Sequence, residues 1–390
     1  MNWIRGRAEP AAPPNPLPVP GLETPAGLLQ RALATLDPGY FAWVMASGIM
    51  SVGTDLLGFS VLSRVILGVT VLAFVLLTTA YVIRLVRFGP FVRQSLQDPT
   101  TAMAYFTVVA GTDVLAIRLA MAEHPLVAAG LGAIGGILWV VLTYGLPWSI
   151  VVAAHRPVLG ELNGTWLVWV VATQSLSIVA VVVTPHAASS WLHVGLSALA
   201  VCLWGVGVML YFILIVMIFL RLFLIEVTPA EMGPAYWIVM GATAISVRAA
   251  AGLLALHGTQ VTPLVTELRP FLVGLSVVLW AFGTWWIPLL VLFGIWRYVV
   301  RGYSRTYEPR LWNVVFPLGM YTVASYTLGR AAGLGFMVSV ARVWVWVGFV
   351  AWATVLGLML VALARAVAHR HDPTPRVLTA DRAAKGHTKK

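Results

Sequence analysis

Long apolar stretches alternate with short polar segments along nearly the whole chain. Each stretch holds roughly 20 or more mostly apolar residues, the length that a helix needs to cross about 30 Å of hydrocarbon. The stretches cover residues 39–59, 61–86, 101–121, 125–154, 164–185, 191–224, 233–257, 268–299, 311–333 and 340–367. The pattern predicts an all-α integral membrane protein with ten transmembrane helices, because helices satisfy their own backbone hydrogen bonds in lipid.

Polar and ionisable residues occupy every second stretch, beginning with the first. A charge that faces lipid costs about 2.5 to 3.5 kcal/mol or more, so such side chains normally turn toward water or protein. The polar stretches are therefore predicted to form an inner ring around a pore, and the apolar ones an outer ring. The residues predicted to line the pore are Gly48, Ser51, Gly111, Thr112, Thr173, Gly241, Thr243, Pro317 and Gly319. For each glycine, close helix packing is an alternative to a kink that faces the pore.

A repeat supports this arrangement. Trp139, Trp204, Trp280 and Trp352 lie in the fourth, sixth, eighth and tenth stretches, and Arg156, Arg221, Arg297 and His369 follow them at one constant spacing. That spacing corresponds to about 25 Å of helix at 1.5 Å per residue. Repeats of one orientation are related by an axis along the membrane normal. The repeat predicts five helical hairpins around a quasi-fivefold central pore.

Composition and charge agree with a membrane protein. Hydrophobic residues make up 60% of the chain and charged residues 10%, and the mean hydropathy is +0.89, whereas soluble domains carry about 25% charged residues. The formal net charge is +11, but most Lys and Arg fall in the tails and at one end of the predicted hairpins. Basic segments stay in the cytoplasm. Both termini are therefore predicted to be cytoplasmic, and the basic residues are read as topology anchors that touch anionic lipid, with no nucleic-acid partner.

Three segments follow from this organisation. Residues 1–37 form a Pro-rich cytoplasmic tail that we expect to be disordered, residues 38–367 the ten-helix transport domain, and residues 368–390 a basic cytoplasmic tail. The spans hold no His-rich cluster or cysteine pair, so we expect no enzymatic activity, no metal and no cofactor.

Three arginines of the inner stretches, Arg118, Arg248 and Arg330, favour an anion as cargo, because clustered arginines replace the hydration that an anion loses. Arg248 is the deepest, and Arg118 and Arg330 are alternatively interface residues. Asp55 and Asp113 bring negative charge into the same stretches. Either a buried ion pair forms, for example between Asp113 and Arg248, or an acid takes up protons and couples anion movement to the proton gradient.

Two segments resemble a known family. Residues 38–49, Pro-Gly-Tyr-Phe-Ala-Trp-Val-Met-Ala-Ser-Gly-Ile, and residues 311–321, which include Phe316-Pro317-Leu318-Gly319, are similar to the first and ninth helices of the tellurite-resistance and dicarboxylate transporter family. That family also includes fungal malate and sulfite transporters and the slow anion channels of plants. The resemblance covers roughly residues 38 to 367.

The resemblance implies five hairpins around a quasi-fivefold axis, a homotrimer in the plasma membrane with one pore in each subunit, and an anion path occluded by a phenylalanine at the position of Phe316. For that ring, ordinary core packing is the alternative. We expect transport of a small organic or inorganic anion such as a dicarboxylate, sulfite, tellurite or chloride. A passive channel, a proton-coupled dicarboxylate carrier and a non-transporting membrane interaction protein remain open.

Overall fold

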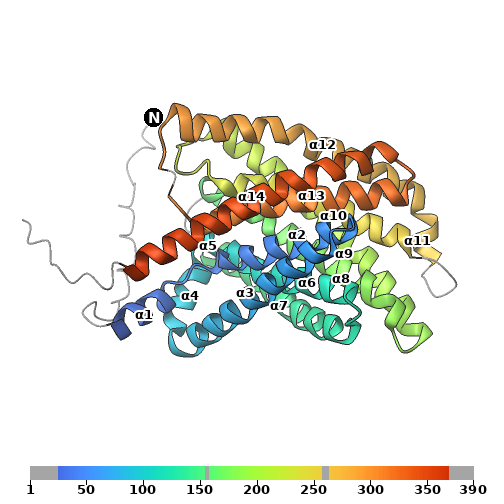
Figure 1. Ribbon diagram of the computed structural model, residues 1–390, viewed down its shortest axis with the longest axis horizontal. Helices are drawn as coiled ribbons and strands as arrows, with labels where there is room; N and C mark the ends of the chain where they lie inside the picture. The colour runs from blue at the N-terminus through green and yellow to red at the C-terminus, as the bar shows by residue number, and fades with distance from the viewer. Residues whose placement is uncertain (1–24, 154–157, 257–262, 305, 369–390) are drawn as a thin grey trace, which may run out of the picture.

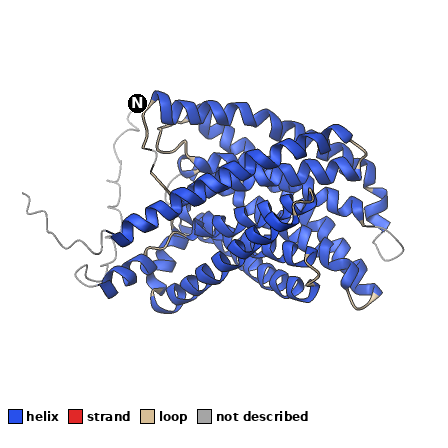
Figure 2. Ribbon diagram, viewed as in Figure 1, coloured by secondary structure: helices blue, strands red, loops and turns tan. Residues whose placement is uncertain are grey.

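The computed structural model describes residues 25–153, 158–256, 263–304 and 306–368, and these residues form helices and turns without a strand (Figures 1 and 2). The long helices are α2 (Ala42–Leu56), α3 (Ser60–Arg87), α6 (Phe106–Met121), α7 (Pro125–Ala153), α8 (Val168–Val183), α9 (Ser190–Leu224), α10 (Ile238–Ala255), α12 (Arg269–Ile295), α13 (Trp312–Ala331) and α14 (Gly335–Ala368). Short helices are α1 (Pro25–Ala34), α4 (Gly89–Gln97), α5 (Pro99–Ala102) and α11 (Pro263–Glu267).

Eight of the described helical segments are long and apolar enough to cross a membrane. The described residues confirm the predicted all-α fold, and their eight candidate spans agree with a membrane protein. Helices α2 and α13 lie within the first and ninth predicted spans but do not meet the same requirement of length and composition, and α2 has only 15 residues. Their crossing of the membrane stays a prediction.

Burial separates the helices into two sets. In the segments Pro99–Met121, Gly164–His186 and Pro234–Ala255, 89%, 83% and 89% of the most apolar window is buried. The corresponding shares are lower for the other candidate spans: 22% for Ser60–Arg87, 11% for Pro125–Val152, 50% for Ser190–Leu224, 28% for Arg269–Val300 and 17% for Gly335–Ala366. Residues 44–54 of α2 and 315–325 of α13 are buried throughout. The buried helices are thus the polar ones, as the sequence predicts, because a polar helix is expensive to expose to lipid.

The buried helices contact one another in a closed order. Helix α2 packs against α6, α6 against α8, α8 against α10, α10 against α13, and α13 against α2 again. Each buried helix also packs against the long helix that follows it in the chain, namely α3, α7, α9, α12 and α14 respectively. We call the first set the inner helices and the second set the outer helices.

The inner helices begin with a common signal. Proline or glycine follows Asp37, Asp98, Asn163, Gly233 and Glu308 at the start of the segments that lead into α2, α6, α8, α10 and α13. Proline suits the first turn because it has no N–H to leave unpaired. The side chains of Asp37, Asp98 and Asn163 each accept a hydrogen bond from the backbone N–H two residues later, at 2.7, 3.0 and 2.8 Å. Such caps satisfy otherwise unpaired donors and set where each helix starts.

The four repeat tryptophans connect neighbouring hairpins. The indole N–H of Trp139 on α7 donates to the Thr173 hydroxyl on α8 (2.8 Å), and that of Trp204 on α9 donates to the Ser246 carbonyl on α10 (3.1 Å). Trp280 on α12 donates to the Ser325 hydroxyl on α13 (2.8 Å), and Trp352 on α14 to the Ser47 hydroxyl on α2 (2.9 Å). Every one of these bonds runs from an outer helix to the inner helix of the next hairpin, and the last joins the end of the chain to its beginning.

The two ends of the described chain lie together. Helices α1, α4 and α5 and the final turns of α14 gather at the left of Figure 1, and α11 lies at the opposite end. Helix α1 falls inside the tail predicted to be disordered, and the backbone carbonyl of Ala34 accepts a hydrogen bond from the Arg84 Nε (3.2 Å). The structure describes Pro25–Ala34 as a helix, and the buried Arg84 at the end of α3 binds its last residue. Residues 1–24 and 369–390 lie outside the described residues.

Candidate functional site

Phe316 is fully buried on α13, one residue before Pro317. The α-carbon of Gly241 on α10 faces Pro317: a side-chain carbon added there would lie 2.9 Å from the proline Cγ. Gly319 faces Ile49 and Met50 of α2 in the same way. The segment Phe316–Gly319 is thus held between α10 and α2, and a larger residue at either glycine would force a neighbouring side chain to shift.

The other two glycines predicted to line the pore also lie at helix contacts. Gly48 of α2 faces Val114 of α6, and Gly111 of α6 faces the ring and carbonyl of Phe41 together with Val44. These contacts are those of close helix packing, the alternative that the sequence left open. That these glycines also line a pore stays a prediction.

The predicted pore-lining hydroxyls form hydrogen bonds within the helix packing. Thr112 donates to the Val108 carbonyl (2.7 Å), Thr243 to the Met240 carbonyl (2.7 Å), and Thr173 to the Trp169 carbonyl (2.9 Å) while it accepts from Trp139. Ser51 donates to the carbonyl of Ser63 on α3 (2.8 Å). Polar atoms buried in protein need such partners. Serine and threonine residues in these helices therefore do not by themselves show that their side chains face water.

The three candidate arginines have different surroundings. Arg118 is buried at the C-terminal end of α6, where it forms an ion pair with Asp55 (3.1 Å) and hydrogen bonds to Ser51 and Ser63. Arg330 is exposed at the end of α13. Arg248 is half-buried, whereas the rest of α10 from Ile238 to Leu254 is buried, and among the described residues no carboxylate lies within ion-pair distance of it.

The ion pair considered for Asp113 and Arg248 does not form. Asp113 is fully buried, its Oδ2 accepts from the Ser175 hydroxyl on α8 (2.7 Å), and its Oδ1 lies against Gly135 of α7 without a hydrogen-bond partner among the described residues. The carboxyl therefore points between α6, α7 and α8. Sequence gives the depth of a residue in a span but not the rotation of its helix, and the rotation decides its partner.

A polar cavity lies where the inner helices begin. It has a volume of about 310 Å³ and is lined by residues from the segments before α8, α10 and α13, by Thr100 before α6, by Arg221 in the last turn of α9 and by Arg297 just after α12. We call it the vestibule. The charged residues that line it in the described part of the chain are Arg221, Arg297, Arg310, Glu161, Glu231 and Glu308. In the sequence, Arg221 and Arg297 were evident only as a repeat at the helix ends, and their partners Glu231 and Glu308 were not predicted.

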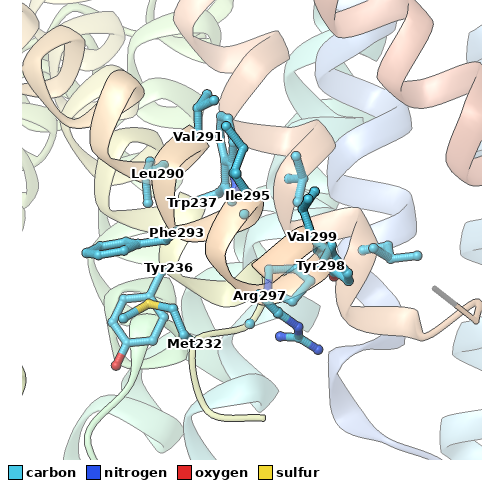
Figure 3. Close-up of a pocket in the computed structure, with 15 residues that line it drawn as sticks. Met232, Tyr236, Trp237, Leu290, Val291, Phe293, Ile295, Arg297, Tyr298 and Val299 are labelled. Atoms are coloured by element: carbon cyan, nitrogen blue, oxygen red, sulfur yellow. The ribbon is translucent and has the colours of Figure 1, made fainter. Parts of the chain in front are cut away.

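Arg297, Gly233 and Pro234 line both the vestibule and a second, apolar cavity. That cavity of about 390 Å³ lies between the segment before α10, the end of α12 and the start of α13, and Figure 3 shows its aromatic and aliphatic lining with the Arg297 side chain at the edge. Arg297 falls in a single π-helical turn, Trp296–Val300, that ends α12, and its guanidinium carbon lies 4.0 Å from the centre of the Tyr303 ring. Turns of this kind are frequent at functional sites.

Buried polar helices surrounded by apolar helices long enough to cross a membrane are typical of a membrane transport protein, as is an inner-helix arginine that has no carboxylate partner among the described residues. The chain belongs to the voltage-dependent anion channel family, which it matches over residues 35–360. This family of channels and transporters is not enzymatic, and the resemblance stated from the first and ninth helices is confirmed.

Relatives from bacteria and archaea are similar to the chain. An uncharacterized membrane protein of Mycobacterium tuberculosis is 42% identical over 147 residues, which cover 38% of this chain and 73% of that protein. Two uncharacterized transporters of Methanocaldococcus jannaschii are 26% and 24% identical over 329 and 341 residues. These alignments cover 82% and 84% of this chain, and 91% and 95% of the two transporters.

Proposed function

We propose that the protein conducts small anions across the cell membrane along a path enclosed by α2, α6, α8, α10 and α13. In this proposal ten helices cross the membrane as five hairpins around a quasi-fivefold axis, both termini are cytoplasmic, and three copies assemble with one path in each. The closed order of contacts among the inner helices and the family membership support it. Candidate cargoes are carboxylates and inorganic anions such as sulfite, tellurite or chloride.

The observation that carries the proposal is the partial exposure of Arg248 and its lack of a carboxylate partner among the described residues. It is the residue of α10 that interrupts an otherwise buried helix, and it has no carboxylate to neutralise it among the described residues. Burying part of a charge without a partner is costly. An arginine without a partner contributes little to folding stability. A transported anion would supply the partner that Arg248 lacks.

Phe316 is the proposed gate. Its ring is fully buried at the start of α13, and the adjoining Pro317 leaves a backbone carbonyl one turn earlier without its helical partner. A kink at this place would tilt the ring toward the centre of the inner helices. An aromatic ring across a narrow path excludes ions by size and by dewetting.

The test is electrical recording of the purified protein in planar bilayers. Arg248→Ala should reduce anion current or shift the reversal potential toward cations, because an unpaired charge in a poorly screened position acts strongly on nearby ions. Arg342→Ala, which removes an exposed arginine from α14, is the control and should change neither quantity. Unchanged current and reversal potential in folded Arg248→Ala protein would reject the proposal.

The same recordings distinguish a passive channel from a proton-coupled carrier. The carrier is kept as a second candidate because Asp113 is fully buried, has a hydroxyl as its hydrogen-bond donor and pairs with no described cation. Anion current at equal pH on both sides supports the channel. Flux that requires a pH gradient and is lost in Asp113→Asn supports the carrier.

A further inference from the structure

The vestibule combines two buried arginines with two partly exposed glutamates. Arg221 Nη2 lies 3.2 Å from Glu231, and Arg297 Nη2 lies 3.1 Å from Glu308. The arginine side chains are only 2% and 3% exposed, whereas the glutamates are 45% and 32% exposed. The cations are therefore fixed in the protein, and the carboxylates approach them from the solvent side.

The two arginines use little of their capacity to donate. Nε and Nη1 of both Arg221 and Arg297 are buried and have no hydrogen-bond partner among the described residues. A guanidinium group presents five N–H donors and binds planar carboxylates and oxyanions best through two of them. Arg221 and Arg297 thus each hold a carboxylate oxygen through Nη2, and the buried Nε and Nη1 have no acceptor among the described residues.

The inner helices add a positive potential to the same place. The segments that lead into α8, α10 and α13 begin at Gly164, Pro234 and Pro309, and residues of all three segments line the vestibule. The N-terminal end of a helix carries about half a positive charge. Among the described residues, the charges of the three arginines and three glutamates of the vestibule cancel formally, so the positive helix ends favour an anion there.

Glu231 is ionised at neutral pH and competes for Arg221. The backbone N–H of Thr228 donates to this carboxyl (2.8 Å) and, with the Thr228 hydroxyl and Arg221, holds the pKa of Glu231 below its ordinary value. The carboxylate of a side chain already occupies the place that the carboxylate of a ligand would take.

We propose that the vestibule is a binding site for a small carboxylate or inorganic oxyanion, which displaces Glu231 and Glu308 from Arg221 and Arg297 before it reaches the inner helices. The site deepens the proposed function and rests on it for its role in transport. No bond is made or broken; one anion exchanges for another on fixed guanidinium groups. The glutamates keep these cations paired when no anion is bound.

The test measures binding of potassium malate and potassium sulfate to the full-length protein in detergent by isothermal titration calorimetry. Glu231→Gln and Glu308→Gln should each tighten binding by about threefold or more, because each removes a charged competitor for an arginine. Glu226→Gln, an exposed glutamate of the same loop as Glu231 that does not line the vestibule, is the matched control and should bind as the wild type does. Arg221→Gln should weaken binding about tenfold or more.

Each outcome decides between the alternatives. An affinity that is the same in the wild type and in both glutamate variants would overturn the inference, because the carboxylates would then be structural partners alone. The absence of detectable binding in the wild type and in the variants would overturn it as well. The test does not depend on whether Arg221→Gln folds. Both glutamate variants retain every arginine, and their affinities alone decide the outcome. If the glutamate variants bind more tightly but the protein passes no anion in liposomes, the vestibule site stands and the proposed function fails.

Discussion

The buried ring of Phe316 has two readings that one substitution separates. If the ring blocks the path, Phe316→Ala should raise anion conductance severalfold while the selectivity that depends on Arg248 is kept. If the ring is ordinary core packing, its removal should cost about 3 to 5 kcal/mol and give no added current. Phe106→Ala is the control, because Phe106 is also fully buried on an inner helix and stacks on Trp169. Folded Phe316→Ala protein with wild-type conductance would place the gate elsewhere.

Single residues also mark the limit of what the sequence could predict. The spans containing Asp55, Asp113, Arg118 and Arg248 were evident from hydropathy, but their partners were not. Arg118 pairs with Asp55 from another hairpin, whereas Asp113 accepts a hydrogen bond from Ser175 and not from Arg248. Two residues at similar depth meet only if both helices are rotated toward each other, and the packing that sets this rotation is not encoded in hydropathy.

Neighbouring hairpins are joined by the repeat tryptophans, and the bond between Trp352 and Ser47 closes the order of helices. Trp352→Phe keeps an aromatic ring but removes the N–H. We expect a loss of about 1 to 3 kcal/mol, from the hydrogen bond and the smaller ring together. The measurement is the thermal unfolding temperature in detergent. Trp148→Phe on α7, where Trp148 is 72% exposed, should leave the unfolding temperature unchanged. An equal shift in both variants would show that the Trp352–Ser47 hydrogen bond adds no stability of its own.

Contact between α10 and α13 depends on the absence of a side chain at Gly241. Gly241→Ala would place its new carbon 2.9 Å from Pro317 Cγ. Overpacking of this kind costs about 1 to 3 kcal/mol, and because Phe316 adjoins Pro317 the conductance should change as well. Gly145→Ala on α7 meets open space and should stabilise the helix slightly, by about 0.5 to 1 kcal/mol. A Gly241→Ala protein as stable as the wild type would show that the two helices separate easily.

Across the whole molecule, the alternation of polar and apolar stretches predicted which helices are buried, since lipid accepts only the apolar ones. Helices α8 and α10, with Thr173 and Thr243, are inside as expected. The vestibule was not predicted. Arg221 and Arg297 were visible as a repeat, but Glu231 and Glu308 lie in loops whose course depends on where the next inner helix begins.

The number of times that the chain crosses the membrane can be measured in one experiment. Helix α2 alone is about 22 Å long at 1.5 Å per residue, shorter than about 30 Å of hydrocarbon, so it needs the preceding turn Pro38–Phe41 to span. The predicted topology places reporters fused before Met1 and after Lys390 in the cytoplasm, because most basic residues lie at that end. An epitope inserted at Glu123, in the turn between α6 and α7, should be outside.

Each pair of reporters tests one short or polar helix. Between Met1 and Glu123 the chain crosses three times if α2 spans, and the two reporters are on opposite sides; without α2 they share a side. Between Glu123 and Lys390 the same argument applies to α13. Labelling of the reporters in intact and permeabilised cells gives the answer. Glu123 on the cytoplasmic side together with either terminus would remove a crossing, and with it the five-hairpin arrangement on which the proposed path depends.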